Sequence, residues 1–483
     1  MSLKLQSDYY DKLDNRFYTI TKPSTVSNPV LVLFNSTLAS ELGMELADLD
    51  MKAEIFSGNY IDDSWTPISQ AYSGHQFGYF TRLGDGRAVL LGEWKDKNGY
   101  LWDIQLKGSG RNAYSRGGDG RATIGSMIRE YIISEAMHGL GIPTTRSLAV
   151  VQTENKVRRE VVKTGGILTR VASSHIRAGT FQYAYEVGGI GLVKQLADYA
   201  INRHYPHLDG SKDRYLNFLD EFTKRQAKLI SLWMSKGFIH GVMNTDNMTI
   251  SGETIDYGPC AFMDYYNPDE VFSSIDTMGR YRYSNQPKIG IWNITRLLEL
   301  FVEIIDSNEE KSIAKLSEII KSFNEYFSYY YSMLMRSKLG LVKEFKGDLK
   351  LIEELLQFMY ANNLDFTNTF RILSQNNYKN EEVFKHINFL SFEKKWMERL
   401  EKEESNIEKA QKIMKNHNPQ IIPRNHLVEK AIREVEDKGD YSFVRIFMEL
   451  LKSPFDYSKK IPEGFLKPMD LDEKVNYKTY CGT

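Results

Sequence analysis

The chain has 483 residues, enough for two or three domains or for one large unit with two lobes. Hydrophobic residues make up 42% and charged residues 26%, which excludes disordered, collagen-like and coiled-coil proteins. The formal net charge of −1 argues against bulk binding of nucleic acid or of an anionic membrane, so any anion site must be local. No apolar run has the length of a signal peptide core or of a membrane span, and we expect a cytoplasmic protein.

The first half of the chain predicts a sheet-rich lobe behind a leader. Residues 1–60 form an irregular leader that packs on the core, with one short strand after Pro29 and a helix beginning at Ser36. Residues 61–190 are dense in glycine, and a helix at 123–140 is embedded among short β-like runs. These runs lie at 88–91, 101–106 and 147–151, and a glycine-rich segment at 186–191 is a candidate hinge.

The second half predicts a mostly helical lobe, residues 191–452, followed by a loop-like tail, residues 453–483, that holds Cys481. Apolar residues recur at spacings of three and four between residues 313 and 334. The charged run 393–415 is interpreted as one amphipathic, solvated helix. The fold class is therefore α+β, with a sheet-rich N-terminal lobe and a helical C-terminal lobe.

One four-residue string occurs twice, at Gly84–Arg87 and at Gly118–Arg121. Glycine on both sides of an acid permits close approach of a backbone to an anion, and each arginine offers a fork of donors suited to phosphate. Either copy alone is also typical of a hairpin turn. Lys107, at the end of a strand-like run between the two copies, is either a surface charge or a phosphate anchor. The embedded helix offers Arg129, Glu130 and Glu135 as candidate contacts, and periodicity does not choose among them.

The strongest local pattern is His240–Asn247, followed by Thr254–Gly258. It resembles the protein kinase catalytic loop and the metal-binding Asp-Phe-Gly motif after it. Val242 stands where a kinase has its catalytic aspartate, so by that template the chain is a pseudokinase. Asp246 offers a base in a different place. The structural alternative is a solvated turn followed by a β-hairpin.

Together these strings resemble the selenoprotein O family, of the bacterial YdiU type. The resemblance implies a protein-kinase-like, two-lobed fold that binds ATP in a flipped orientation. It also implies transfer of AMP, with release of pyrophosphate, to Ser, Thr or Tyr hydroxyls of target proteins. The motifs that carry it are Pro67–Gly78, Leu83–Arg87, Gln105–Gly110, Ser115–Arg121, Arg129–Tyr131, Thr169–Ser174, His240–Asn247, Asn418-Pro and Pro423–His426.

The resemblance also assigns roles to individual residues. Asp246 would be the general base, and Asn247 and Asp256 would bind Mg²⁺ or Mn²⁺. Lys107 would contact the phosphates with Glu130 as its partner, and Arg170 and Arg177 would hold the inverted polyphosphate. The nucleotide pocket would be lined by Gly84, Gly86, Arg87, Asp119 and Gly120, with Asp256 also at the nucleotide.

Two alternatives to adenylyl transfer stay open, a non-catalytic ATP-binding pseudokinase scaffold and a phosphotransferase that uses Asp246 as its base. The expected partners are ATP and proteins with hydroxyl side chains, with no nucleic acid and no membrane, and we expect a monomer. Cys481 stands where eukaryotic members of the family place selenocysteine. A reversible disulfide with Cys260 is one hypothesis, and a small buried apolar role for Cys260 is the other.

Overall fold

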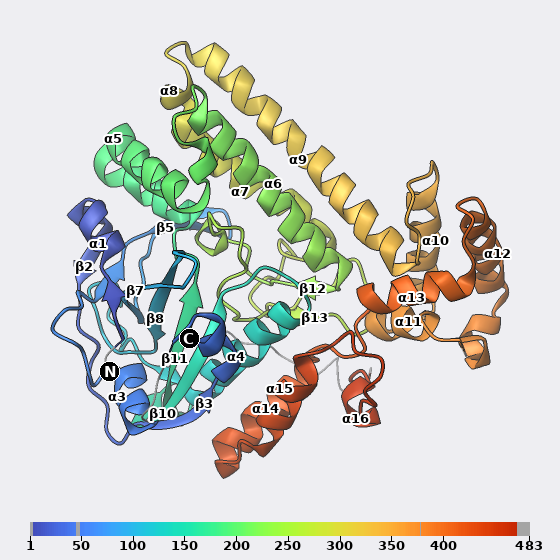
Figure 1. The fold of residues 1–483 in the computed structure, drawn as a ribbon, viewed down its shortest axis with the longest axis horizontal. Coiled ribbons are helices and arrows are strands. Elements are labelled where there is room, and N and C mark those ends of the chain that lie inside the picture. Colours follow the sequence, from blue (N-terminus) through green and yellow to red (C-terminus); the bar gives the residue numbers. More distant parts are fainter. Residues whose placement is uncertain (1–2, 45–48, 377, 471–483) are drawn as a thin grey trace.

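An antiparallel sheet organises the N-terminal part of the protein (Figure 1). The structure, a computed structural model, describes residues 3–44, 49–376 and 378–470. Within them the sheet has nine strands in the order β2-β4-β7-β8-β11-β10-β3, with β1 on β7 and β9 on β11. The strands are β1 Leu5–Gln6, β2 Tyr18–Ile20, β3 Val30–Phe34, β4 Ile68–Gln70, β7 Ala88–Lys95, β8 Leu101–Lys107, β9 Ala122–Thr123, β10 Arg146–Arg158 and β11 Val162–Ala172. A separate hairpin pairs β5 Ser73–Gln76 with β6 Tyr79–Arg82.

Both faces of this sheet are buried. Successive side chains of a strand point to opposite sides, so neighbouring residues enter different cores. On β10, Val150 belongs to the core that includes helix α4 (Ile124–Gly139). Its neighbours Ala149 and Val151 belong to a second core with leader helices α2 (Ser36–Glu41) and α3 (Leu49–Ser57). The apolar runs predicted at 88–91, 101–106 and 147–151 are therefore confirmed as strands covered on both sides.

The leader is more regular than the sequence predicts. The strand after Pro29 and the helix at Ser36 are confirmed, and Asn35 caps that helix by accepting from the Leu38 N–H. The prediction of an otherwise irregular leader is wrong, since β1, β2 and α1 (Asp8–Lys12) also lie there. Strands of two or three residues are too short to show an alternation of apolar and polar residues.

The embedded helix lies where the sequence predicts it. Thr123 accepts from the Ser126 N–H at its start, and the chain leaves the helix through Leu140 and Gly141. The residues from Ile124 to Met137 are buried except for Ser126, because the sheet covers one side and helices α14 and α15 cover the other. A helix without a solvated face can place a charged side chain in the interior.

The C-terminal part is helical, and its long helices α6 and α9 run side by side (Figure 1). The expected hinge at 186–191 lies within helix α5, which kinks at Gly189, so a lobe boundary at residue 190 falls inside a helix. The helices are α5 Ala178–His204, α6 Arg214–Ser235, α7 Gln286–Leu298, α8 Val302–Ile305, α9 Glu309–Lys338, α10 Asp348–Ala361, α11 Phe366–Leu373, α12 Ile387–Glu401, α13 Ile407–His417, α14 Asn425–Lys438, α15 Ser442–Leu451 and α16 Glu463–Leu466; two short strands, β12 Phe238–Ile239 and β13 Ala261–Phe262, pair with each other.

The charged run 393–415 is two helices rather than the one that its composition predicts. Helix α12 ends at Glu401, and Glu404 adopts a positive φ of 60°. Asn406 then caps α13 by accepting from the Lys409 N–H. A side chain that caps a new helix competes with continuation of the old one.

The mixed α+β class, with a sheet-rich N-terminal region, agrees with the sequence analysis. Among the described residues no helix combines the length and the apolar character that crossing a membrane requires.

We expect the packing of α4 on the sheet to contribute strongly to stability. Ile128 is fully buried there, so Ile128→Ala should lower the free energy of unfolding by about 2–5 kcal/mol. Ile313→Ala, at a half-exposed position of α9, is the matched control and should cost less than 1 kcal/mol. Denaturant unfolding followed by circular dichroism measures both, and equal losses would contradict this description of the core.

Candidate active site

Two neighbouring strands place three polar side chains on one face of the sheet. Arg170 of β11 lies opposite Gln105 of β8, and Lys107 follows two residues later on the same face. Arg170 donates to the Gln105 Oε1 from Nε at 3.1 Å and from Nη2 at 2.6 Å. This face also carries α4, so the charged ends of Lys107 and Arg170 meet Glu130 of that helix.

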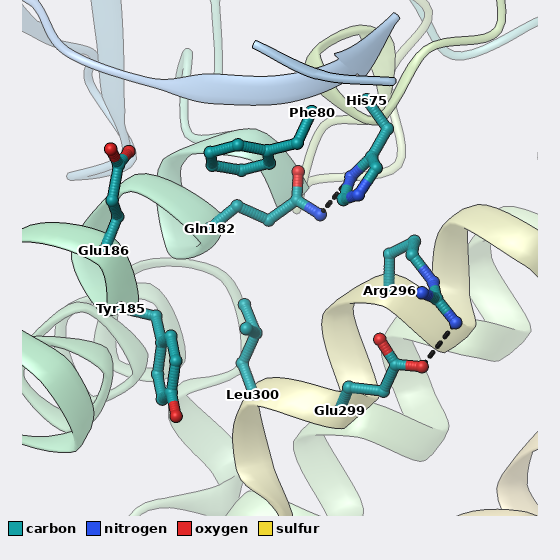
Figure 2. Close-up of a pocket in the computed structure, with 8 residues that line it drawn as sticks. All are labelled: His75, Phe80, Gln182, Tyr185, Glu186, Arg296, Glu299 and Leu300. Carbon is teal, nitrogen blue, oxygen red and sulfur yellow. Dashed lines mark hydrogen bonds and ion pairs between the residues drawn. The ribbon is translucent and has the colours of Figure 1, made fainter. Parts of the chain in front are cut away.

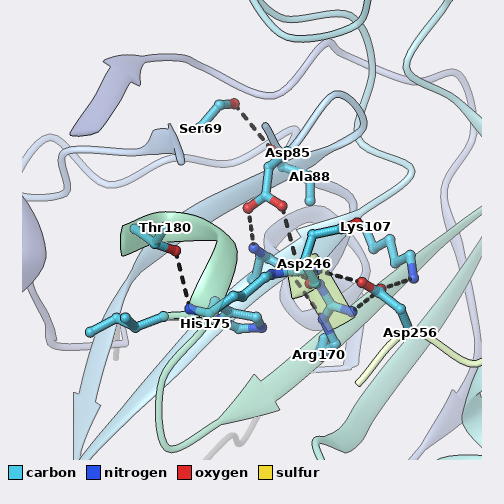
Figure 3. A network of polar contacts seen from close by, with 12 residues as sticks. Ser69, Asp85, Ala88, Lys107, Arg170, His175, Thr180, Asp246 and Asp256 are labelled. Atoms are coloured by element: carbon cyan, nitrogen blue, oxygen red, sulfur yellow. Dashed lines mark hydrogen bonds and ion pairs between the residues drawn. The ribbon is translucent and has the colours of Figure 1, made fainter. Parts of the chain in front are cut away.

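Asp256 is the centre of the site (Figure 3). Its carboxylate accepts from Lys107 Nζ at 2.8 Å, from Arg170 Nη1 at 2.7 Å and from Arg177 Nη1 at 2.7 Å. The backbone of Asp256 has a φ of 63°, a left-handed conformation that aspartate tolerates better than most residues. Three cations therefore converge on one carboxylate that is a quarter exposed.

Two further acids balance the charge. Glu130 pairs with Lys107 at 2.5 Å and with Arg170 at 3.2 Å. Asp85, which lies between the two glycines of the first repeat, accepts from Gln105 Nε2 at 2.7 Å and lies 3.6 Å from Arg177 Nη2. Three acids thus face three bases, which is how a strongly charged site fits inside a protein with almost no net charge.

The pKa values of the two carboxylates next to Arg177 are shifted in opposite directions. Burial alone would raise the pKa of Asp256, but Lys107, Arg177 and Arg170 together hold it well below its usual range. Burial raises the pKa of Asp85, and the same cations oppose that shift. Asp256 is therefore the carboxylate that stays ionised under all ordinary conditions.

Asp246 also contacts Arg177 and lies in the short turn Thr245–Asn247. Arg177 Nη1 donates to the Asp246 carbonyl oxygen at 2.8 Å while also contacting Asp256. The Oδ1 of Asp246 is buried and has no hydrogen-bond partner among the described residues. Burial raises the pKa of Asp246 to about 6, with Arg177 acting in the opposite direction. A carboxylate with this pKa is largely ionised at pH 7 and can still accept a proton.

The rest of the catalytic-loop pattern is well ordered around Asp246. Asn247 Nδ2 donates to the Val242 carbonyl oxygen at 2.9 Å, which leaves the Oδ1 of Asn247 as an acceptor. His240 Nε2 lies 3.0 Å from the Ile255 carbonyl oxygen and so ties the loop to the segment that carries Asp256. The alternative of a solvated turn followed by a hairpin is wrong, because the loop is buried and Asp256 leads into no hairpin of its own.

The two copies of the repeated string have different surroundings. At Gly84 and Gly86 an added Cβ would lie 2.5 Å from atoms of Tyr114, so this turn packs on the loop after β8. Gly120 packs as closely on Gly110, and Asp119 pairs with Arg159 at 3.0 Å on the surface. Among the described residues, no hydrogen bond or ion pair joins Arg87 or Asp119 to the Asp256 cluster.

Of the candidate contacts for Lys107 on α4, Glu130 is the one that pairs with it. Glu135 instead pairs with Arg146 at 2.8 Å, and Arg129 pairs with Glu429 at 3.2 Å. The sequence alone did not indicate individual roles for Gln105, Asp85 or Tyr72. The ring of Tyr72 lies under the Arg177 guanidinium, with 4.6 Å between the guanidinium carbon and the centre of the ring. The position of Asp85 between Gly84 and Gly86 is the sequence feature that could have indicated a role for it.

The two cysteines differ in what the structure describes. Cys260 is fully buried near the end of the segment that follows Asp256, as the apolar alternative expects. Cys481 lies outside the described residues. The disulfide between them stays a prediction.

Comparisons with known proteins agree on one family. The family model "Protein adenylyltransferase SelO" matches residues 1–452. Two relatives called "Protein nucleotidyltransferase YdiU" are each 50% identical to this chain over 98% of its length. The one from Clostridium perfringens strain SM101 is covered over 96% of its own length, and the one from Geobacillus kaustophilus over 98%. One from Clostridium botulinum strain Eklund 17B is 48% identical over the whole chain and 98% of its own length. These matches define a nucleotidyltransferase. The chain belongs to the protein adenylyltransferase SelO family.

We expect the cluster to behave as an anion site that Asp256 fills. Asp256→Asn keeps the shape and the left-handed backbone but leaves three cations with one fewer carboxylate, so it should destabilise the fold by about 3 kcal/mol. Inorganic tripolyphosphate without metal should then raise the Tm of the variant more than that of the unaltered protein. Asp209→Asn, at an exposed ion pair, is the control. Equal responses to tripolyphosphate would contradict the interpretation.

Proposed function

We propose that this protein transfers AMP from ATP to Ser, Thr or Tyr hydroxyls of target proteins, within a protein-kinase-like fold of two lobes. One observation carries the proposal. Nη1 of Arg177 donates both to the Asp256 carboxylate and to the backbone carbonyl of Asp246, so a cluster of cations and a carboxylate with a pKa of about 6 lie next to each other.

The proposed reaction uses these residues as follows. Asp246 accepts the proton of the acceptor hydroxyl as its oxygen attacks the α-phosphorus. The new O–P bond forms while the bond from the α-phosphorus to the bridging oxygen breaks, and that electron pair leaves with pyrophosphate. Lys107, Arg170 and Arg177 stabilise the charge on the departing group because they are fixed in place before the reaction begins.

The positions of the cations support an inverted orientation of ATP. Lys107, Arg170 and Arg177 are each at most 5% exposed, so the most highly charged end of the nucleotide belongs in the interior. The α-phosphorus then lies on the side of Asp246. We assign Gly84, Gly86, Arg87, Asp119 and Gly120 to the lining of the nucleotide pocket, as the family resemblance implies.

The residues present also fit a divalent cation. Asn247 and Asp256 each offer a side-chain oxygen as a ligand. Within the described ranges, no group of three or more His, Cys, Asp or Glu could hold a metal without further ligands. When bound, Mg²⁺ or Mn²⁺ would neutralise charge on the polyphosphate.

The first test follows the label. With ATP labelled separately at the α- and γ-phosphate, only the α-label should enter protein. Transfer of the γ-label would favour a phosphotransferase, and ATP binding without transfer of either label would favour a scaffold.

Transfer should also depend on pH through Asp246. Protonation removes its ability to accept a proton, so the rate should fall about tenfold per pH unit below a pKa of about 6 and level off above it. Asp246→Asn should retain ATP binding, slow transfer by about 10²–10⁴ and lose this limb of the profile. Equal losses of binding and rate would indicate a structural role for Asp246.

Val242→Asp restores the residue that the kinase template requires, and we expect it not to create a protein kinase. In the inverted orientation the γ-phosphate lies away from position 242, so a carboxylate there has nothing to activate. The measurement is incorporation of γ-labelled phosphate into protein, and robust incorporation would contradict the inverted orientation.

A further inference from the structure

A cavity of about 400 Å³ opens beside the loop that carries Asp246 (Figure 2). It lies between the β5–β6 hairpin, helix α5 and the end of helix α7. None of the residues that form it belongs to the Asp256 cluster. They are His75, Phe80, Gln182, Tyr185, Glu186, Arg296, Glu299 and Leu300.

A closed set of hydrogen bonds connects this pocket to the candidate base. The His75 N–H donates to Thr245 Oγ1 at 2.7 Å, and that hydroxyl donates to Gln182 Oε1 at 2.7 Å. The amide of Gln182 is thereby oriented so that its Nε2 donates to His75 Nδ1 at 2.9 Å. Thr245 directly precedes Asp246, so the pocket and the base are held in a fixed relation.

The hairpin approaches Asp246 without a gap. An added Cβ at Gly74 would lie 2.3 Å from the Asp246 Oδ1, and at the turn the Phe77 N–H donates to the Tyr281 hydroxyl at 3.1 Å. The hairpin that carries the pocket residues His75 and Phe80 thus also contacts the candidate base through Gly74.

The lining favours an uncharged side chain. Phe80, Tyr185 and Leu300 contribute apolar surface that faces the space between them (Figure 2). Arg296 and Glu299 pair with each other, and Glu186 pairs with Arg82 at 2.5 Å. Burial lowers the pKa of His75, and Arg296 and Arg280 also disfavour its charged form, so the ring is neutral at pH 7.

Exposed apolar side chains also lie on the β5–β6 hairpin and close to it in the fold. Tyr79 and Phe80 on the hairpin are 80% and 47% exposed. Met278, at 87% exposure, lies two residues before Arg280, whose guanidinium approaches Gly78 of the same hairpin. Exposed apolar side chains gathered beside a pocket are typical of a surface that binds another protein.

We propose that this pocket binds an aromatic or large aliphatic side chain of the target protein, a few residues from the hydroxyl that receives AMP. The occupant is a segment of the substrate protein, and the inference rests on the proposed function. It adds a selection rule to that function, namely that acceptor hydroxyls are chosen by an apolar neighbour at a fixed sequence distance.

The test begins with the sites that the unaltered full-length protein modifies. A protein extract is incubated with ATP and the modified peptides are mapped by mass spectrometry. We expect Phe, Tyr, Trp, Leu, Ile or Met to be enriched at one position relative to the acceptor. A synthetic peptide with that pattern then serves as the substrate for kinetics.

Two variants address the pocket directly. Leu300→Trp fills it and Phe80→Ala removes a wall at a half-exposed position, so at least one should fold normally. Each should raise the KM for the peptide at least tenfold, with a smaller change in kcat, and weaken the enrichment. Tyr329→Ala, at an exposed aromatic residue of α9, is the matched control and should change neither.

The outcomes distinguish a failure of the proposed AMP transfer from a failure of the proposed side-chain pocket. If no α-label enters any protein, the proposed function fails and the inference fails with it. If labelling occurs but the sites show no apolar enrichment, or show a charged residue instead, the inference alone is overturned. An unchanged peptide KM in both folded pocket variants would overturn it as well.

Discussion

The carboxylate of Asp256 and its three cations are the constraint on which the rest of the site depends. Lys107 comes from β8, Arg170 from β11 and Arg177 from the start of α5, so one carboxylate connects the sheet to the helical part. Buried guanidinium and ammonium groups require anions, and each anion here is matched. A polyphosphate would offer the same cations more charge than Asp256 does, so under the proposed function one anion would take the place of another at this site.

Local patterns predicted much of this arrangement. The strand that ends at Lys107 and the embedded helix both have clear periodicity, so their existence and their contact could be predicted. Local patterns could not predict which acid of the helix meets Lys107, because Glu130 and Glu135 are both buried on a helix without a solvated face, and only the family resemblance assigned Glu130. Only the positions of β8 and Arg146 decide that Glu130 faces the cluster and Glu135 faces away from it.

The remaining differences also have physical causes. The strings at Gly84 and Gly118 are identical in sequence, yet Asp85 is buried beside Gln105 whereas Asp119 pairs with Arg159 at the surface. Turns of identical sequence have different surroundings because different parts of the chain pack on them, and a four-residue string carries no information about those distant parts. The pocket beside Asp246 combines a hairpin with helices more than a hundred residues away, and no spacing in the sequence brings His75 next to Gln182 and Arg296.

The contribution of the leader to the sheet affects how the protein can be shortened. Strand β3 covers the outer edge of β10, and β1 and β2 lie along β7 and β4. A chain that begins near residue 61, where the dense motifs start, would keep every candidate catalytic residue but uncover the backbone of β10 and β4. Unpaired strand edges of this kind can pair with strands of other molecules. The leader strands between Leu5 and Phe34 therefore prevent association of the protein through the edges of its sheet.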